Sequence, residues 1–311
     1  MITTVTLNPA IDRTIVVERF AFGSVNRVVR AREDMGGKGI NVARVLVALG
    51  SRVLATGFIG HDNLDHVRQL IDRDGIPVDF VTVAGATRQN TKLIEASSQT
   101  TTDINEAGFA ISEEHLSDLK SRIRSFAAQS SFVVFSGSVP RGLPQDVYRD
   151  LIDQVAPVRR TILDADGAHL LAGLAGHPYL IKPNLLELEN ALGRPLPTQR
   201  DIVRAARELS NRYKTAYILV SMGASGSILI TADRALHASS VPVIVRGTVG
   251  AGDAMLAGFI HGIDTGMTDR ESLAWATACG ALAVSNEGTE TIDKQSVIRL
   301  AGQVSVTALA D

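Results

Sequence analysis

The amino-acid sequence predicts an α/β fold, in which a mostly parallel β-sheet is covered by helices on both faces and a small second sheet is added. Short apolar runs rich in β-formers alternate with segments of helical periodicity, a pattern typical of parallel strands joined by helices. In addition, residues 12–29 and 88–105 read as half-exposed strands. The 311 residues, 45% of them hydrophobic and 21% charged, can bury a large core.

The elements of the main sheet follow in chain order. The expected strands are residues 2–7, 53–59, 78–83, 132–136, 161–164, 216–221 and 227–231. Apolar residues at helical spacing predict helices at residues 39–49, 64–74, 112–129, 145–156, 185–192, 199–213, 255–263 and 273–284. Gly50, Gly75 and Gly193 follow three of these helices and mark their ends.

The half-exposed segments are separated in the sequence and are too polar for the centre of a sheet. We expect them to form one accessory sheet over the mouth of the main domain, from segments of about residues 12–35 and 86–108. Residues 1–311 would then be a single domain that carries this sheet as a lid.

The stretch RGTVGAGDAMLAGFIHGI, residues 246–263, predicts an anion-binding loop that leads into a helix. Gly250 and Gly252 can adopt backbone angles closed to other residues, so that successive N–H groups turn toward one point. A helix N-terminus carries about half a positive charge and suits a phosphoryl group. An anion bound there would repel the carboxylate of Asp253. A role as the base that accepts a proton from an attacking hydroxyl would explain why a carboxylate stands at this position. The alternative is an ordinary glycine-rich turn with an acidic first helical turn.

Asn184 and Glu187, in the segment KPNLLE at residues 182–187, have the spacing of a capping box. Their pairing therefore permits a purely structural interpretation, and Thr198 with Asp201 repeats it before the next helix. The glycine-rich bend at residues 222–226 permits either passage of a nucleotide or a simple hairpin.

Composition and missing motifs exclude several classes of protein. The formal charge is −2 without a long Lys and Arg run, which argues against nucleic acid or a membrane as partner and favours a small molecule. No signal peptide pattern or long apolar run is present, and the single Cys279 fits a core position in a cytoplasmic protein. The P-loop motif, the dinucleotide motif and zinc-binding His spacing are all absent from the sequence.

Several segments nevertheless occur in a telling order: NPAID (8–12), GGKGINVAR (36–44), TRQN (87–90), SGSVP (136–140), KPNLLE (182–187) and TVGAGDAMLAGF (248–259). From about Leu7 to Asn286 the chain resembles the ribokinase/PfkB carbohydrate kinase superfamily. This resemblance implies a Rossmann-like, ribokinase-like domain with a β lid that also tends to join two subunits. It further implies ATP and Mg²⁺ as cofactors, and a homodimer through the lid.

The resemblance also implies roles for particular residues. Asp253 would be the base, with the backbone of Gly250, Ala251 and Gly252 as the anion hole. The sugar phosphate would be bound by Asp12, Gly37, Lys38, Asn41, Arg88 and Ser138. The nucleotide would be bound by Lys182, Asn184, Ser221, Gly223, Gly226 and Asn286. Glu187 and Asn184 would hold Mg²⁺, through water because this ion loses its water reluctantly.

Within the superfamily the resemblance is greatest to bacterial kinases of fructose 1-phosphate, and the TDIN segment at 102–105 favours these over kinases of tagatose 6-phosphate. The expected reaction is transfer of the ATP γ-phosphoryl group to O6 of fructose 1-phosphate. Lys38 and Arg88 argue against an uncharged sugar or nucleoside as acceptor. A non-catalytic sugar-phosphate sensor would not need Asp253. Arg141 departs from the small residue or proline common after SGSVP, and Arg27 is a further cation without an assigned ligand.

Overall fold

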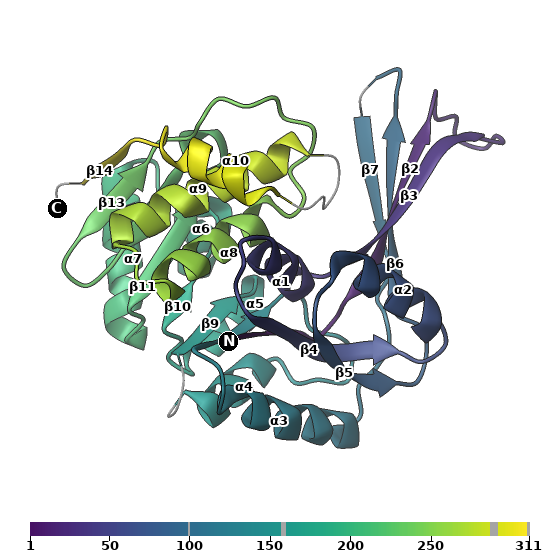
Figure 1. Cartoon of the computed structure of the whole chain (residues 1–311), viewed down its shortest axis with the longest axis horizontal. Coiled ribbons are helices and arrows are strands. Elements are labelled where there is room, and N and C mark those ends of the chain that lie inside the picture. Colours follow the sequence, from purple (N-terminus) through teal and green to yellow (C-terminus); the bar gives the residue numbers. More distant parts are fainter. Residues whose placement is uncertain (99, 157–159, 287–291, 310–311) are drawn as a thin grey trace.

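A large, mostly parallel sheet forms the centre of the molecule (Figure 1). The computed structural model describes residues 1–98, 100–156, 160–286 and 292–309. Within these ranges ten strands pair in the order β14-β13-β12-β11-β10-β9-β8-β1-β4-β5. Their bounds are β1 Ile2–Thr6, β4 Val53–Gly60, β5 Val78–Val83, β8 Phe132–Ser136, β9 Arg160–Asp164, β10 Leu180–Ile181, β11 Tyr217–Ser221, β12 Ser227–Ile230, β13 Ala235–Ala238 and β14 Val306–Ala308. The neighbouring strands from β5 to β11 pair in parallel. The pairs β11–β12, β12–β13 and β13–β14 are antiparallel.

The central strands of the main sheet are buried on both faces because helices cover both, whereas no residue of the edge strand β14 is buried. In β8, Phe132 and Val134 belong to one apolar cluster, and Val133 and Phe135 belong to the other. This alternation follows from the two-residue period of a strand, and the continuous apolar run is typical of parallel sheets. The core therefore consists of two layers, one on each side of the sheet.

The helices divide between these two layers. One layer contains α1 Lys38–Ala48, α2 Leu64–Asp74, α8 Ala251–Asp264, α9 Asp269–Ser285 and α10 Lys294–Ala301. The other contains α3 Glu113–Ala127, α4 Val147–Val155, α5 Gly167–Leu174, α6 Leu185–Leu192 and α7 Gln199–Tyr213. A short 3₁₀ turn, η1 Gly223–Ser225, joins β11 to β12.

A second sheet projects away from the helical layers (Figure 1). Its strand order is β3-β2-β6-β7, with bounds β2 Ala10–Val17, β3 Val28–Gly36, β6 Arg88–Glu95 and β7 Thr100–Asn105. β2 and β6 pair in parallel although they come from distant parts of the chain. The strands lie within residues 10–36 and 88–105, so the first segment begins two residues before the expected boundary. We call these four strands the accessory sheet.

The fold class expected from the sequence is confirmed, while some elements were missed. The expected bounds of α2, β5 and β8 agree with the structure. The short elements α5, β13, β14 and α10 were not expected. The bend after β11 leads into an antiparallel hairpin, which is one of the two alternatives considered. Among the described residues no helix is both long and apolar enough to cross a membrane.

Candidate active site

A cavity of about 550 Å³ lies between the main sheet and the accessory sheet. From the main domain it is lined by residues at or after the carboxyl ends of parallel strands, such as Thr6 of β1, Ser138 after β8 and Lys182 after β10. From the accessory sheet it is lined by all four strands, for example by Asp12 of β2 and Asp103 of β7. Ligands of open α/β sheets bind at this edge, so this cavity is the candidate site.

Most of the site residues expected from the sequence line this cavity. They are Asp12, Gly37, Lys38, Asn41, Arg88, Ser138, Lys182, Asn184, Glu187, Ser221, Gly250, Gly252 and Asp253. Ala251 opens α8 between two lining glycines. Gly223, Gly226 and Asn286 lie outside the lining: the glycines flank the turn after β11, and Asn286 caps the end of α9.

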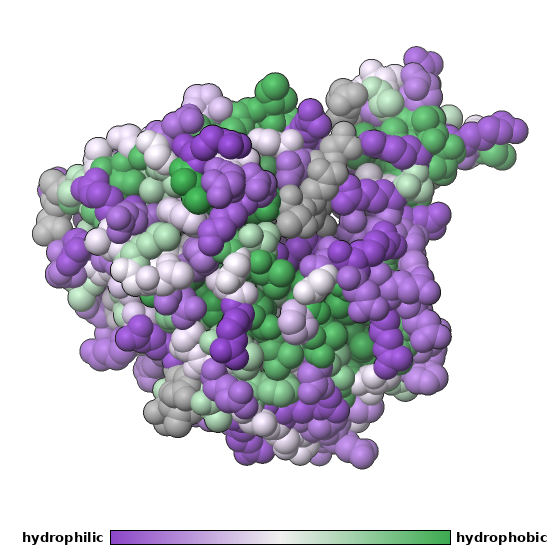
Figure 2. All heavy atoms as spheres, in the orientation of Figure 1, coloured by the Kyte–Doolittle hydropathy of each residue, from purple (hydrophilic) through white to green (hydrophobic). Residues whose placement is uncertain are grey.

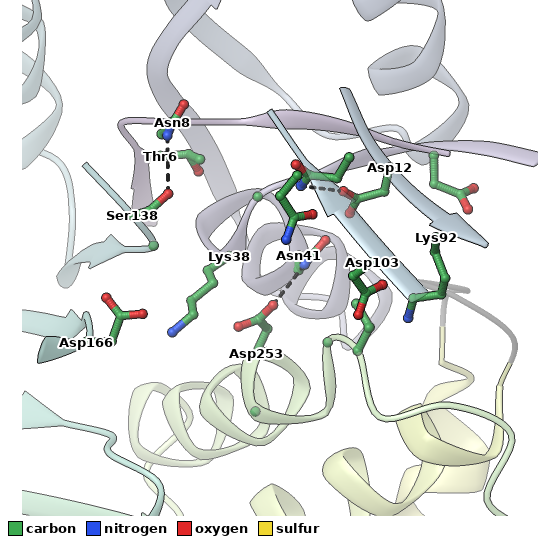
Figure 3. A pocket seen from close by; sticks show the side chains of 18 of the residues that line it. Thr6, Asn8, Asp12, Lys38, Asn41, Lys92, Asp103, Ser138, Asp166 and Asp253 are labelled. Carbon is green, nitrogen blue, oxygen red and sulfur yellow. Dashed lines mark hydrogen bonds between the residues drawn. The ribbon is translucent and has the colours of Figure 1, made fainter. Parts of the chain in front are cut away.

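Asp253 lies in the first turn of α8 and points toward α1 (Figure 3). Its residue is 6% exposed, and its Oδ2 accepts a hydrogen bond of 2.8 Å from Nδ2 of Asn41. Burial raises the pKa of Asp253 to about 6, and the nearby carboxylate of Asp164 acts in the same direction. The hydrogen bond from Asn41 and the charges of two lysines oppose the rise. Asp253 is therefore ionised at neutral pH, yet more basic than an ordinary carboxylate.

The loop before α8 has the backbone conformation expected of an anion-binding turn only in part. Gly250 is left-handed, with φ +77, a region that favours glycine. The first N–H groups of a helix lack an intrahelical acceptor, so those at the start of α8 are available to an anion. The expectation that Gly252 also needs an unusual backbone angle was wrong, because Gly252 lies in the helix. Its small size matters instead: a Cβ there would lie 3.1 Å from Nζ of Lys182.

Two lysines approach Asp253 and share one buried carboxylate, that of Asp164 at the end of β9. Nζ of Lys38 lies 3.2 Å from Oδ1 of Asp164, and Nζ of Lys182 lies 3.6 Å from Oδ2. Burial disfavours the charged form of Lys38, but the surrounding carboxylates, Asp164 first, outweigh it and raise its pKa. Lys38 therefore remains charged beside the start of α8. Figure 3 shows Lys38 extending between Asp166 and Asp253.

On the accessory side, Asp12 is held by Asn90. Nδ2 of Asn90 donates to Oδ1 of Asp12 at 3.1 Å, across the β2–β6 pair. The carboxylate packs directly against Gly36, where a Cβ would lie 2.0 Å from Oδ2 of Asp12. Burial raises the pKa of Asp12, and the hydrogen bond from Asn90 opposes this. The arrangement places a carboxylate and an amide where they can bind hydroxyl groups.

Arg88 and Ser138 meet at the edge of the cavity, together with Asn8. Oγ of Ser138 lies 3.4 Å from Nη2 of Arg88 and 3.3 Å from Nδ2 of Asn8. Arg88 also donates to the carbonyl oxygens of Asn8 and Glu106. One cation, one hydroxyl and one amide thus face the same small region, which suits a phosphate on a ligand.

Asn184 and Glu187 form the capping box of α6. Oδ1 of Asn184 accepts from the N–H of Glu187, and Oε2 of Glu187 accepts from the N–H of Asn184, each at 2.8 Å. Both residues also line the cavity. The backbone of Asn184 pairs with that of Ser221. The two residues therefore cap the helix, and their place in the cavity lining also permits contact with a metal ion or a nucleotide.

Several cavity residues were not assigned from the sequence. They are Asn8, Arg13, Asp34, Asn90, Lys92, Asp103, Asn105 and Asp166, and Asp164 lies immediately behind the two lysines. Asp164 ends a predicted buried strand at the binding edge of the sheet, and a carboxylate at that place was the available signal. The residues of β6 and β7 carried no such signal, because their facing depends on the pairing of the accessory strands.

Comparison with known proteins places this architecture in a defined class. Residues 5–295 match the model of the pfkB family carbohydrate kinases. The chain belongs to this family. It is therefore a phosphotransferase whose acceptor is a carbohydrate, and sugar kinases of this family use ATP as phosphoryl donor.

Individual relatives make the comparison more specific. The chain is 38% identical to a 1-phosphofructokinase of Vibrio cholerae over 309 residues, which cover 99% of this chain and 97% of the relative. It is similar to the crystal structure of phosphofructokinase-2 from Escherichia coli in complex with substrates and products, with a TM-score of 0.92, 27% identity and coverage of 97% and 98%. The structure of Arabidopsis thaliana ribokinase complexed with ribose and ATP shares the fold at a TM-score of 0.78 and 22% identity, with coverage of 96% and 98%.

Proposed function

We propose that this protein transfers the γ-phosphoryl group of ATP to the O6 hydroxyl of fructose 1-phosphate, which gives fructose 1,6-bisphosphate. The observation that carries the proposal is the division of the cavity. A buried carboxylate and two lysines gather at the start of α8, while Arg88, Ser138 and Asn8 form a second polar group at the accessory edge. The similarity to 1-phosphofructokinase over almost the whole chain supports this acceptor.

Asp253 is the residue that would take the proton from O6. Its raised pKa, about 6, makes it a stronger base than an exposed aspartate while it stays ionised at neutral pH. As the oxygen attacks, negative charge moves over the transferring group. The N–H groups of Gly250, Ala251 and Gly252 at the start of α8 and the ammonium groups of Lys38 and Lys182 would stabilise that charge.

Lys38 takes a different role in this proposal from the one expected from the sequence. It was expected to bind the phosphate already present on the sugar. Its ion pair with Asp164 and its position beside Asp253 support contact with the transferred group instead. The phosphate of the substrate would then be bound by Arg88, Ser138 and Asn8. Asp12, Asn41 and the backbone at Gly37 would hold the sugar hydroxyls.

The nucleotide would lie on the side of Lys182 and Asn184, with the turn after β11 (Ser221, Gly223 and Gly226) and Asn286 around its base. Gly226 has φ +85, and a Cβ there would lie 2.0 Å from the carbonyl oxygen of Ala238, so glycine allows this turn to pack closely against β13. Among the described residues no group of three or more His, Cys, Asp or Glu could hold a metal ion. Mg²⁺ in kinases takes one or two carboxylates and otherwise phosphate and water. Glu187, with Asn184, fits that donor set, and the ion would neutralise charge on the phosphates.

The accessory sheet would act as the lid of a single domain that spans residues 1–311, and as the contact between two subunits of a homodimer. Exposed apolar side chains on this sheet and its hairpin support the contact: Phe20, Phe22, Val25, Val28, Val29 and Ile104. Figure 2 shows hydrophobic residues, in green, among hydrophilic ones on the projecting sheet. A reaction that consumes ATP also belongs in the cytoplasm.

The acceptor is tested by measuring ATP turnover with fructose 1-phosphate, fructose 6-phosphate, tagatose 6-phosphate and free fructose. We expect kcat/KM to be highest for fructose 1-phosphate, and at least about 100-fold lower for free fructose, because the binding groups for the phosphate lose their partner. A preference for tagatose 6-phosphate would assign the second acceptor of the family. Equal efficiency on free fructose would refute a phosphate site at Arg88.

A further inference from the structure

Arg44 is a buried cation one helical turn beyond Asn41 on α1, and it does not line the cavity. The residue is 3% exposed. Its guanidinium donates to Oδ1 of Asn41 at 2.8 Å, to Oδ2 of Asp74 at 2.7 Å and to the carbonyl oxygen of Met35. These acceptors belong to α1, α2 and β3. Arg44 therefore joins three elements directly behind the site.

The chemistry of arginine fixes the orientation of the Asn41 side chain. A guanidinium can only donate hydrogen bonds, so the atom of Asn41 that faces Arg44 must be the carbonyl oxygen. The amide nitrogen then faces Oδ2 of Asp253, at 2.8 Å. The reversed amide would place NH₂ against the guanidinium and a carbonyl oxygen against the carboxylate. Both contacts would be repulsive, so one orientation is selected.

This orientation favours one protonation state of Asp253. An amide N–H stabilises the ionised carboxylate, whereas an amide oxygen could bind only a protonated carboxyl group. Other charged groups also act on Asp253: Asp164 from β9 favours the protonated form, while Lys38 from α1 and Lys182 after β10 favour the ionised form. Arg44 itself is faced by Asp74, and its charge also reaches Asp12.

We propose that Arg44 is a positioning residue for phosphoryl transfer: by fixing the amide of Asn41, it keeps Asp253 ionised and leaves the second carboxylate oxygen for the acceptor hydroxyl. The inference rests on the proposed role of Asp253 as the base. It concerns a residue that touches neither ligand, and its effect passes through a single side chain. Because the effect passes through Asn41, an experiment can distinguish it from a direct electrostatic effect of the buried Arg44 charge.

The experiment is a double-mutant cycle of Arg44→Met and Asn41→Ala, followed by the pH dependence of kcat/KM for fructose 1-phosphate at saturating ATP. Arg44→Met frees the Asn41 amide to turn when Asp253 is protonated. We therefore expect the acidic limb to move up by about one pH unit, the size of one hydrogen bond to a charged group. kcat should fall by roughly 10- to 100-fold through misplacement of the base, with little change in KM for ATP.

In the Asn41→Ala background, Arg44→Met should leave the acidic limb where it is, because the side chain that transmits the effect is gone. An equal shift in both backgrounds would show that Arg44 acts only through space, and no shift in the first would show no effect on the base. Either result overturns the proposal. If Arg44→Met does not fold, Arg44→Gln replaces it, since its neutral amide can present either end to Asn41.

Arg122→Met is the matched control. Arg122 also donates to three residues, Asp118 of α3 and Asp79 and Phe80 of β5, but lies outside the cavity lining. It should lower stability without moving the pH profile, and a shift there equal to that of Arg44→Met would overturn the proposal. The role of Asp253 is judged separately: if Asp253→Asn keeps near-normal turnover, the proposed function fails. If that variant is inactive but Arg44→Met has a normal profile, only the role of Arg44 fails.

Discussion

The two sheets hold their side chains in different ways. In the main sheet, β8 is buried at every position, whereas every residue of β7 in the accessory sheet is exposed. Asp253 and Asp164, on the side of the main sheet, are almost completely buried. Arg88 of β6 is only partly buried and binds a hydroxyl and two carbonyl oxygens.

This contrast separates two tasks in one cavity. Groups that must meet a developing charge gain from a fixed, water-poor setting, because preorganised charges there need not rearrange during the reaction. Groups that recognise the acceptor must admit it and release it, which a sheet with one open face permits. We therefore expect changes on the main side to affect kcat, and changes on the accessory side to affect KM for the sugar.

The largest expected effect comes from Asp253→Asn on the main side. The amide cannot accept the proton, so kcat should fall by roughly 100-fold or more, while KM for ATP and the fold are kept. The measurement is steady-state turnover together with ATP binding and melting temperature. Near-normal turnover would show that the buried carboxylate is not the base, and would remove the proposed division of tasks.

The pH dependence of kcat/KM gives a second test of Asp253 on the main side of the cavity. Since the pKa of Asp253 is raised to about 6, kcat/KM should fall about tenfold per unit below that pH. Stability should not fall with it through this group: a carboxyl group with a raised pKa in the folded state contributes most stability at low pH and loses it as pH rises through 6. Activity and melting temperature measured at pH 5 to 8 should therefore separate. If the fall of kcat/KM at acidic pH is unchanged in Asp253→Asn, another group causes it.

On the accessory side, Arg88→Ala should raise KM for fructose 1-phosphate by about 10- to 150-fold, the scale of one charge-assisted hydrogen bond. KM for ATP should change little. Arg141→Ala serves as the control, because Arg141 binds the carbonyl oxygen of Gly108 and lies outside the cavity lining. A defect of Arg88→Ala confined to ATP would place this cation at the other ligand.

A smaller effect is expected at Glu187, where the observed helix cap and the proposed metal role fall on one residue. Glu187→Gln keeps an oxygen that can accept from the N–H of Asn184, so the melting temperature should change little. The variant should need several-fold more Mg²⁺ to reach its maximal rate, because an amide is a weaker ligand for this ion. Glu271→Gln is the matched control, since Glu271 forms the same capping box with Thr268 on α9. Identical Mg²⁺ titrations of both variants would return Glu187 to capping alone.

The smallest effect on the single chain is expected from Phe22→Ser at the tip of the accessory sheet. The side chain is 95% exposed, so its loss should hardly change the stability of one subunit. If the lid joins two subunits, the dimer should weaken measurably in sedimentation experiments. Ile298→Ser, an exposed apolar residue of α10 at 44%, should leave the assembly unchanged. A dimer that is equally strong in both variants would place the contact elsewhere.

Most strands of the main sheet could be predicted from the sequence because they are local apolar runs, and the long helices have a clear apolar stripe. The signature at residues 248–259 likewise predicted that Asp253 lies at the site, and this residue lines the cavity. Other features depend on tertiary contacts. One is the close approach of Lys182 to Gly252, and another is the proposed role of Arg44, which depends on the atom of Asn41 that it contacts. The strands β13 and β14 are too short for a clear apolar pattern, and their pairing with neighbouring strands defines them.

Two short connections join the accessory sheet to the main domain. β1 ends at Thr6 and β2 begins at Ala10, while β3 ends at Gly36 and α1 begins at Lys38. Gly37, at φ +119, is thus the only residue between β3 of the accessory sheet and the helix that carries Asn41 and Arg44. With one residue between them, we expect a movement of this end of the accessory sheet to involve α1 as well. If a bound sugar shifts β3, the shift should therefore also reach Asn41 on α1 and the proposed base, Asp253, to which Asn41 donates.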